Sequence, residues 1–173
     1  MKQQVIINIG VSGSGKTTWS TNFIKKNPKY FRINRDDIRK MLVGTLEGYY
    51  SSPEFISRET YVSEIEEILF VNSLGKGKSV ILDNTHLKPS YIQKWVDFVA
   101  AWNEDLEESE KVDFVFAIFQ ENNIQELKKR VNVRDAPSSW KALDYIDKQA
   151  TSIRSAVAYA TDNYPNNIIF ITK

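Results

Sequence analysis

The stretch Ile7–Ser20 reads INIGVSGSGKTTWS, and it decides the fold that the rest of the chain must accommodate. An apolar run leads into three glycines within six residues, and a lysine and two threonines follow them. Residues 10–17 match G-x-x-x-x-G-K-[ST], the P-loop pattern. Glycine tolerates positive φ and close backbone approach, so successive amides can point at phosphate oxygens beside the start of a helix. We therefore predict a phosphate cradle between a buried strand and a helix.

The residues of this loop have distinct expected roles. Lys16 is expected to bridge the β- and γ-phosphates of a nucleotide, and the Thr17 hydroxyl to ligate Mg²⁺. The expected cofactors are therefore ATP and Mg²⁺, the latter held by few protein ligands. A glycine-rich turn without a ligand is the alternative, and the strand before and helix after the loop disfavour it. The full expected nucleotide-binding set within the loop is Gly10, Ser12, Gly13, Ser14, Gly15, Lys16, Thr17 and Thr18.

Composition limits the other possibilities. The chain has 173 residues, of which 42% are hydrophobic, so residues 1–173 can form one domain with a core. The absence of cysteine excludes disulfides, thiolate metal sites and cysteine nucleophiles. A net charge of +1 argues against an extended nucleic-acid track and leaves room for a local basic pocket. No apolar run is long enough for a secretory signal or a membrane span, so we expect a cytoplasmic protein.

Apolar runs alternate with helical patterns, which is typical of an α/β protein with a mainly parallel sheet covered on both faces. We predict a P-loop NTPase-type three-layer sandwich with a small basic helical lid at about residues 128–141. The expected strands are Val5–Ile9, Tyr30–Ile33, Ser79–Asp83, Val112–Phe119 and Ile168–Ile171. The expected helices are Lys16 to about Lys26, Asp36 to about Val43, Glu54–Leu74, one that begins near Pro89, Asn123–Asn132, and Ser139 to about Ala160.

Three finer expectations concern helices. Asp36 or Asn34 is expected near the N-cap of the second helix. On the helix over 54–74, one face carries Tyr61, Ile65, Ile68, Leu69 and Asn72. On the helix that begins near Pro89, a 3.6-residue period predicts core contacts for Tyr91, Trp95, Phe98, Val99 and Trp102.

The segment INRDDIRKML (33–42) follows the second expected strand. In a parallel sheet, ligands bind at the carboxyl edge, which also presents the P-loop. Asp36 is therefore expected near the γ-phosphate, where a carboxylate can accept the proton of an attacking hydroxyl. Arg39 lies one helical turn further on and can hold an acceptor phosphate. The alternative is a capping aspartate with a surface ion pair, and the neighbouring P-loop favours the functional interpretation.

Two further segments carry candidate site residues. Asp83 ends the strand SVILD and can hold the magnesium water shell or orient Lys16 or the acceptor. The loop 84–86 after it, with Thr85 as a candidate substrate contact, equally suits an ordinary turn, and His86 is more typical of a loop residue than of a metal ligand. In LKKRVNVRD (127–135), Arg130 and Arg134 share a face if the helix continues. Guanidinium groups suit a transferring phosphoryl group, although a solvated basic face is the alternative.

The order and spacing of these four blocks resemble the kinase domain of phage polynucleotide kinase, over roughly residues 1–160. The resemblance implies transfer of the ATP γ-phosphate to a 5′-hydroxyl end of DNA or RNA, in the cytoplasm of an infected host. It implies Asp36 as general base and Arg39 as the ligand of the phosphate next to the acceptor nucleoside. It also implies Lys16 and Thr17 as phosphate and Mg²⁺ ligands, and Arg134, supported by Arg130, as the lid arginine on ATP.

The chain departs from that family in three places. The family loop usually reads D-x-T-N, whereas residues 83–86 read DNTH, with His86 in place of the asparagine. The lid carries fewer basic residues than the family suggests. The chain also ends after the kinase domain, so we expect no phosphatase half within it.

Three other functions remain open from the sequence. Related phage kinases phosphorylate hydroxymethyl pyrimidines within DNA and share the same machinery. A nucleoside or small-metabolite kinase shares the P-loop and the lid, and a nucleotide-gated binding module would use the cradle without transfer. The sequence carries no signal for base preference, for single or double strands, or for oligomeric state. The aromatic residues Trp19, Tyr49, Tyr50 and Trp140 are candidates for base stacking and, equally, for packing.

Overall fold

The computed structural model describes residues 2–120, 123–135 and 139–172, with side chains for all of these except 134, 135 and 139–143. Five parallel strands form one sheet in the order β2-β3-β1-β4-β5. The α/β prediction with a parallel sheet is therefore confirmed. The strands are β1 (Gln4–Ile9), β2 (Tyr30–Ile33), β3 (Ser79–Leu82), β4 (Asp113–Phe119) and β5 (Ile168–Ile171). The helices are α1 (Lys16–Lys26), α2 (Arg35–Val43), α3 (Phe55–Gly75), α4 (Pro89–Trp102), α5 (Ile124–Asp135) and α6 (Ser139–Asn163), with the 3₁₀ turns η1 (Tyr49–Ser51) and η2 (Pro165–Asn167).

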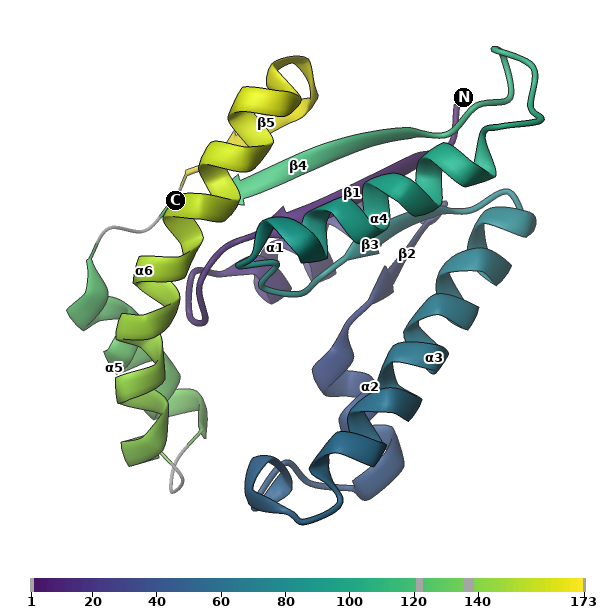
Figure 1. The fold of residues 1–173 in the computed structure, drawn as a ribbon. Helices are drawn as coiled ribbons and strands as arrows, with labels where there is room; N and C mark the ends of the chain where they lie inside the picture. Colours follow the sequence, from purple (N-terminus) through teal and green to yellow (C-terminus); the bar gives the residue numbers. More distant parts are fainter. Residues whose placement is uncertain (1, 121–122, 136–138, 173) are drawn as a thin grey trace.

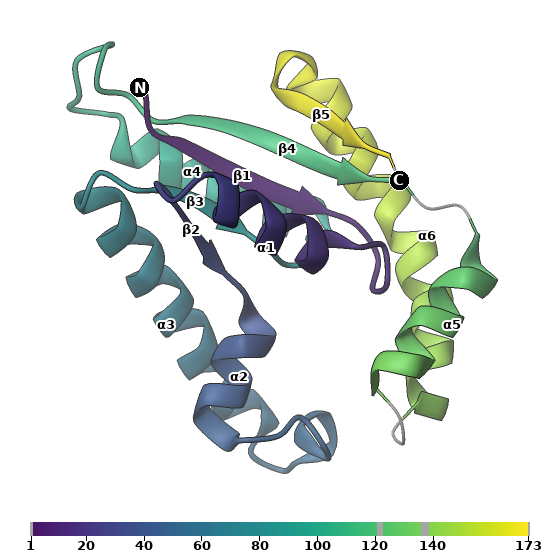
Figure 2. The same cartoon turned by 180° about the vertical axis from the view of Figure 1, so that it is seen from behind.

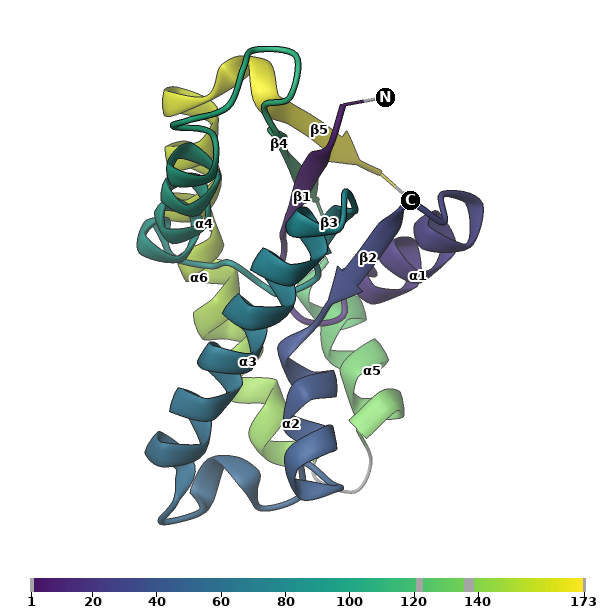
Figure 3. The same cartoon turned by 90° about the vertical axis from the view of Figure 1, so that its right-hand side faces the viewer.

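Helices cover both faces of the sheet. In Figure 1, α4 and α6 lie in front of the strands, and in Figure 2, turned by 180°, α1 lies in front. Figure 3 shows the same layers from the side, with α1 across the sheet from α4 and α6. Strand β1 is apolar almost throughout because it is buried on both faces. Its residues Val5, Ile7 and Ile9 join the core beneath α3, α4 and α6, whereas Ile6 joins the core beneath α1.

The structure shows which helix faces are buried, and one expectation needs correction. On α3, the face shared by Tyr61, Ile65 and Ile68 is largely exposed: Tyr61 and Ile68 are 61% and 58% exposed, whereas Ile65 packs against the core. The buried face instead carries Val62, Phe70 and Leu74, because apolar residues surround this helix and their spacing does not select one side. On α4, Trp95 and Val99 are buried as predicted, but Tyr91 is 52% exposed and its neighbour Ile92 is buried in its place.

Two pairs of helices extend past the carboxyl ends of the strands, α2 and α3 on one side and α5 and α6 on the other (Figures 1 and 2). Helix α2 begins after Asn34, whose side chain accepts a hydrogen bond from the Asp37 amide at 3.1 Å. Of the two predicted caps, Asn34 is therefore the N-cap and Asp36 lies in the first turn. Residues 136–138, in the predicted lid, lie outside the described residues. Within the described ranges, no helix is both long enough and apolar enough to cross a bilayer.

Candidate active site

The loop between β1 and α1 has the backbone geometry of a phosphate cradle. Gly13 and Gly15 have φ angles of 80° and 96°, which favour glycine. A Cβ on Gly10 would lie 2.8 Å from Ser14 Oγ, so the loop closes tightly at this position as well. Helix α1 begins after Gly15, and no side chain in the described part of the chain caps it. Its first amides and its dipole are thus available to an anion.

The side chains of the loop are arranged for a ligand at the start of α1. Lys16 is buried, and its Nζ donates to the carbonyl oxygen of Val11 at 2.7 Å. Thr17 and Thr18 are exposed in the first turn of α1. The loop therefore combines a buried lysine with solvent-exposed threonine side chains in the first turn of α1, an arrangement that suits a Mg²⁺-bound triphosphate.

The helix pair α5–α6 rests directly on this loop. A Cβ on Gly13 would lie 3.0 Å from the carbonyl oxygen of Leu127 and 3.1 Å from Val131 Cγ2, both on α5. From α6, Gln149 Oε1 accepts the Ser12 amide proton at 2.8 Å, and the Tyr145 hydroxyl is hydrogen-bonded to Ser12 Oγ. Both helices therefore contact the P-loop directly.

The contact of α5 with the loop predicts an effect of Gly13→Ala beyond backbone strain. Gly44 has a similar φ of 76° but open space around it, so Gly44→Ala measures the strain alone, about 1 kcal/mol. We expect Gly13→Ala to lower the free energy of unfolding in urea by about 1 kcal/mol more than Gly44→Ala, because the methyl group meets α5. Equal losses for the two variants would contradict the close packing of α5.

Hydrogen bonds join the three loops that follow β2, β3 and β1 at the carboxyl edge. The Asn34 side-chain amide donates to the carbonyl oxygen of Asp83, and the Arg35 amide donates to Asn84 Oδ1 at 2.9 Å. The Gly10 amide in turn donates to the carbonyl oxygen of Thr85 at 3.1 Å. The loop of residues 83–86 thus connects the start of α2, which carries Asp36, to the P-loop.

The carboxylate of Asp83 is fully buried, and both of its oxygens accept hydrogen bonds from protein donors. Oδ1 accepts from the Asn8 side chain at 3.0 Å, and Oδ2 accepts from Arg32 Nε at 2.6 Å. Arg32 also donates to Asp37 Oδ2 at 2.5 Å. The polar residue Asn8 within an otherwise apolar strand was a sequence signal for this buried cluster. Asp83 is therefore anchored in the sheet edge, and its role as a metal or substrate ligand stays a prediction.

Asp36 and Arg39 contact each other and belong to a larger cluster centred on Glu59. Arg39 Nη1 donates to Asp36 Oδ1 at 2.6 Å, while its Nε and Nη2 each donate to a carboxylate oxygen of Glu59 at 2.8 Å. Arg35 and the Tyr49 hydroxyl also donate to Glu59, at 2.9 and 2.8 Å. Burial alone would raise the pKa of Glu59, but the hydrogen bonds from Arg39, Arg35 and Tyr49 lower it to about 2. Glu59 was not identified from the sequence, because it is one of four glutamates on α3 and no local pattern distinguishes it from the other three.

Two tyrosines, Tyr50 and Tyr145, are hydrogen-bonded to residues of the candidate site. The Tyr50 hydroxyl donates to Asp36 Oδ1 at 3.3 Å. Tyr145 is the residue bonded to Ser12 of the P-loop. Tyr50 thus contacts Asp36 beside the α2–α3 pair, and Tyr145 contacts the P-loop from α6.

The other aromatic and basic candidates have different surroundings. Tyr49 is 1% exposed and Trp19 packs against Phe23 and Phe119, so both are packing residues, whereas Tyr50 is 59% exposed. On α5, Arg130 Nη1 approaches the carbonyl oxygen of Gly13 at 3.5 Å. Helix α5 continues to Asp135 and includes positions 130 and 134. The side chains of Arg134 and Trp140 lie outside the described residues.

His86 is buried and has a φ of 44°, the only positive φ among the described residues other than glycine. Its Nδ1 lies 2.7 Å from the carbonyl oxygen of Asn8, so Nδ1 carries the proton and donates it. Burial, opposed by this hydrogen bond, lowers the pKa of His86 to about 4, and the charges of Lys16, Arg35 and Lys94 act in the same direction as burial. The imidazole is therefore neutral in the folded protein at pH 7.

This neutral histidine predicts a pH dependence of stability. Unfolded histidine has a pKa of about 6.5. Between about pH 6.5 and pH 4 the imidazole is therefore protonated in the unfolded chain and neutral in the folded chain, which favours unfolding as the pH falls. We expect the free energy of unfolding to fall by roughly 2 kcal/mol more over that window in the wild type than in His86→Asn. Because the chain has one histidine, NMR of its ring reports the folded pKa directly. A ring that titrates near 6.5 would contradict the prediction.

Comparisons with known proteins agree with this architecture. Residues 5–151 match the model of a family described as an AAA domain. A protein of Autographa californica nuclear polyhedrosis virus, named as a bifunctional polynucleotide kinase/RNA ligase, is 30% identical over 110 residues, which cover 58% of this chain and 15% of that protein. A protein of Acanthamoeba polyphaga mimivirus, named as a bifunctional polynucleotide phosphatase/kinase, is 30% identical over 138 residues, which cover 80% of this chain and 25% of that protein. The chain thus spans a quarter or less of the length of these relatives.

Solved structures give the same result at the level of the fold. A chain in the structure of the Pnkp1/Rnl/Hen1 RNA repair complex superimposes with a TM-score of 0.66 at 26% identity, over 90% of this chain and 45% of that chain. A fungal RNA kinase superimposes with a TM-score of 0.58 over 99% of this chain and 38% of that chain. At 16% identity, this second similarity supports the fold alone.

Proposed function

This chain belongs to the AAA domain family, and from that membership and the geometry of its P-loop edge we propose that it is an ATP-dependent kinase that phosphorylates the 5′-hydroxyl end of DNA or RNA. The relatives named as polynucleotide kinases confirm the resemblance predicted from the sequence. The observation that carries the proposal is the connection of the Asp36 segment to the P-loop through residues 83–86. A carboxylate and a phosphate cradle on one sheet edge are the two parts that phosphoryl transfer to a hydroxyl requires.

The P-loop residues hold the triphosphate in this mechanism. The first amides of α1 and the Lys16 ammonium contact its oxygens, and the exposed Thr17 hydroxyl is the first-turn ligand available to Mg²⁺. Mg²⁺, when bound, neutralises charge on the β- and γ-phosphate oxygens. The described residues contain no group of three or more histidine or acidic side chains that could hold a metal. Mg²⁺ usually keeps several waters and takes few protein ligands. Asp83 is the buried carboxylate that would act on that water shell.

Asp36 performs the proton transfer. Its carboxylate accepts the proton of the acceptor hydroxyl as that oxygen attacks the γ-phosphorus, and the bond to ADP breaks. The Asp36 side chain is 48% exposed, so an acceptor can reach it. Tyr50, which donates to the same carboxylate oxygen, is displaced or shared when the acceptor hydroxyl binds.

Arg39 and the lid arginines bind phosphates on either side of the reaction. Arg39 uses three of its five N–H donors on Glu59 and Asp36, and within the described residues two remain for the acceptor phosphate. Arg130 lies beside the P-loop at Gly13, and Arg134 follows one turn later on α5. Both suit the charge that spreads over the transferring phosphoryl group, within a lid at about residues 128–141.

Transfer of label from γ-labelled ATP tests the proposal directly. The protein is incubated with 5′-hydroxyl oligonucleotides of DNA and RNA, hydroxymethylated duplex DNA, and free nucleosides. We expect label on the 5′ ends of oligonucleotides. Label only within the hydroxymethylated duplex would identify a base kinase, and label only on nucleosides would identify a small-molecule kinase. Tight ATP binding without transfer to any acceptor would identify a binding module, and each of these results would reject the proposal.

A further inference from the structure

The acidic and basic residues are distributed very unevenly along this chain. All 22 acidic residues lie outside residues 1–35 and 68–82. These two segments contain β1, the P-loop, α1, β2, β3 and the last third of α3. They carry nine lysines and arginines: Lys2, Lys16, Lys25, Lys26, Lys29, Arg32, Arg35, Lys76 and Lys78. Lys2, Arg32 and Arg35 pair with carboxylates from other parts of the chain, and Lys16 is buried in the P-loop. The remaining five lysines, at positions 25, 26, 29, 76 and 78, carry the local excess of positive charge.

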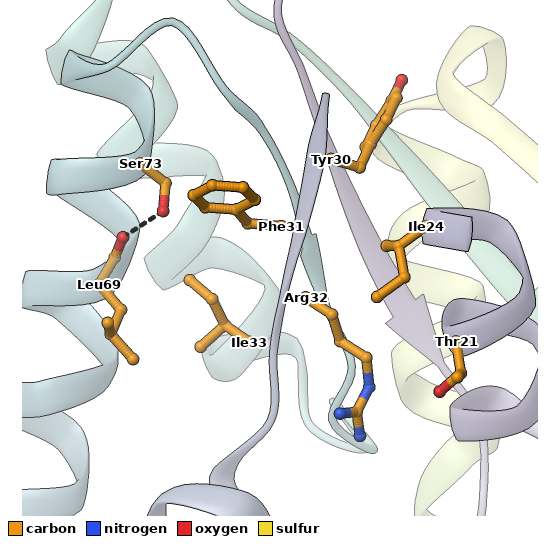
Figure 4. Close-up of a pocket in the computed structure, with 8 residues that line it drawn as sticks. All are labelled: Thr21, Ile24, Tyr30, Phe31, Arg32, Ile33, Leu69 and Ser73. Carbon is orange, nitrogen blue, oxygen red and sulfur yellow. Dashed lines mark hydrogen bonds between the residues drawn. The ribbon is translucent and has the colours of Figure 1, made fainter. Parts of the chain in front are cut away.

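A groove of about 420 Å³ lies on this edge, beside strand β2. Figure 4 shows that Phe31 and Ile33 point from β2 toward α3, whereas Tyr30 and Arg32 point toward α1. The Phe31 ring is 44% exposed, although phenylalanine is usually buried. Strand β2 is the outermost strand of the sheet, so the groove has an open side. The remaining lining residues are Thr21, Ile24, Leu69 and Ser73.

Two basic turns meet at the amino-terminal end of this groove. Strands β2 and β3 pair in parallel with Tyr30 opposite Ser79, and the Ser79 amide donates to the carbonyl oxygen of Lys29 at 3.1 Å. The turn with Lys25, Lys26 and Lys29 therefore adjoins the turn with Lys76 and Lys78. The Lys78 ammonium lies 5.4 Å from the centre of the Phe31 ring, and the Lys29 ammonium lies 5.2 Å from that of Tyr30. We name these five lysines and Phe31 the β2-edge surface.

We propose that the β2-edge surface binds the body of a single-stranded nucleic acid whose 5′ end lies at Asp36, an inference that rests on the proposed function. An exposed aromatic ring among cations is the combination that holds single strands, because bases stack on the ring and phosphates pair with the lysines. The groove leads toward the site along the chain, since β2 is followed by Asn34 and by the first turn of α2, which carries Asp36. Four strand residues span about 13 Å, and a stacked strand has one phosphate per about 3.4 Å. The groove thus matches about four nucleotides.

Equilibrium binding of a fluorescent oligonucleotide of about 12 nucleotides tests this surface in the absence of ATP. The test variant Lys25→Gln/Lys76→Gln/Lys78→Gln removes three charges from the β2-edge surface. Each phosphate contact contributes about 0.7 to the slope of log affinity against log salt for single strands. We expect the affinity at low salt to fall about tenfold and the salt slope to fall by about 2. Phe31→Ala, which leaves the charge unchanged, is expected to lower the affinity by roughly tenfold with an unchanged slope.

The matched control is Lys2→Gln/Lys111→Gln/Lys148→Gln, which removes the same charge elsewhere; Lys2 and Lys111 pair with carboxylates. We expect this control to bind the oligonucleotide as the wild type does. We also expect the test variant to keep its KM for ATP and for a nucleoside 3′-monophosphate, which is too short to reach the groove. Equal oligonucleotide affinity for the test variant and the control would overturn the proposal. The same result is expected if the groove binds an acidic segment of a partner protein and not a nucleic acid.

This measurement separates the two proposals. Oligonucleotide binding that depends on the β2-edge lysines, without transfer to any nucleic acid, would reject the kinase function and retain the surface. Transfer to 5′ ends with affinity independent of these lysines and of Phe31 would reject the surface and retain the kinase.

Discussion

Asp36→Asn is expected to lower the rate of phosphoryl transfer by about 10²–10⁴-fold, the usual contribution of a general base. The amide is nearly the same size as the carboxylate but cannot accept the proton of the attacking hydroxyl. Arg39 loses one ionic contact in this variant, yet it keeps both hydrogen bonds to Glu59. The acceptor site should therefore retain its shape, and the loss should fall on kcat rather than on the KM for ATP.

The neighbouring residue Asp37 provides a matched control. It lies in the same first turn of α2 and has a similarly exposed side chain, but its carboxylate pairs with Arg32. Asp37→Asn should keep transfer within a few-fold of the wild type, because surface ion pairs contribute little. Single-turnover transfer and ATP binding are measured for both variants. Full activity in Asp36→Asn, or an equal loss in both variants, would show that Asp36 acts only in the structure of the helix start.

The strands and the P-loop could be predicted from the sequence because each depends on local chemistry. Strand β1 is a short apolar run before glycines, and β2 and β5 have the predicted ends. The pattern also placed Asp36 at the carboxyl edge, since parallel strands present their following loops on one side. These parts of the fold follow from chain order and backbone preference alone.

The surroundings of the site residues could not be predicted in this way. The hydrogen bonds between Arg39 on α2 and Glu59 on α3 join residues that are 20 positions apart in the sequence, and no periodicity encodes such a pair. The same limit applies to Tyr145, which contacts Ser12 across 133 positions. Tyr91 was misplaced because it and its neighbour Ile92 both fit an apolar helical pattern, and a one-residue shift rotates the buried face of a helix by about 100°. In each of these examples, tertiary packing determines the contacts or the burial of the side chain.

Glu59→Gln is expected to lower the free energy of unfolding at pH 7 by about 3 kcal/mol. The Glu59 carboxylate accepts four hydrogen bonds, two from Arg39 and one each from Arg35 and Tyr49. Three of these donors belong to cations, and their side chains are only 13% and 22% exposed. Removal of the shared charge leaves two largely buried guanidinium groups with one carboxylate each, Glu66 for Arg35 and Asp36 for Arg39. This costs more than the loss of a surface ion pair. Urea denaturation measures the loss.

A matched glutamate separates this effect from a general loss of charge. Glu54 pairs with Arg58 on the same helix, but its side chain is 64% exposed. Glu54→Gln should change stability by less than about 0.5 kcal/mol. A similar loss for Glu54→Gln and Glu59→Gln would contradict the special role of the cluster.

The pH dependence gives Glu59→Gln a second readout. The folded pKa of Glu59, about 2, lies below its unfolded value of 4.5. Its contribution to stability is therefore complete above pH 4.5 and is lost as the pH falls toward 2. We expect the stability difference between wild type and Glu59→Gln to shrink over that window and to stay constant above it. A difference that is independent of pH down to 2 would mean that Glu59 stabilises the fold by shape rather than by charge.

The same variant also bears on the chemistry, because Glu59 fixes the guanidinium that we assign to the acceptor phosphate. If Glu59 serves to position Arg39, then Glu59→Gln should raise the KM for a phosphate-bearing acceptor more than the KM for ATP, at a temperature where the variant is folded. If Arg39 instead moved closer to Asp36, whose Oδ1 already accepts a hydrogen bond from Arg39 Nη1, it would compete with the acceptor hydroxyl for this carboxylate. In that case kcat would fall as well. Equal changes in both KM values would assign Glu59 to stability alone and would leave Arg39 positioned by Asp36.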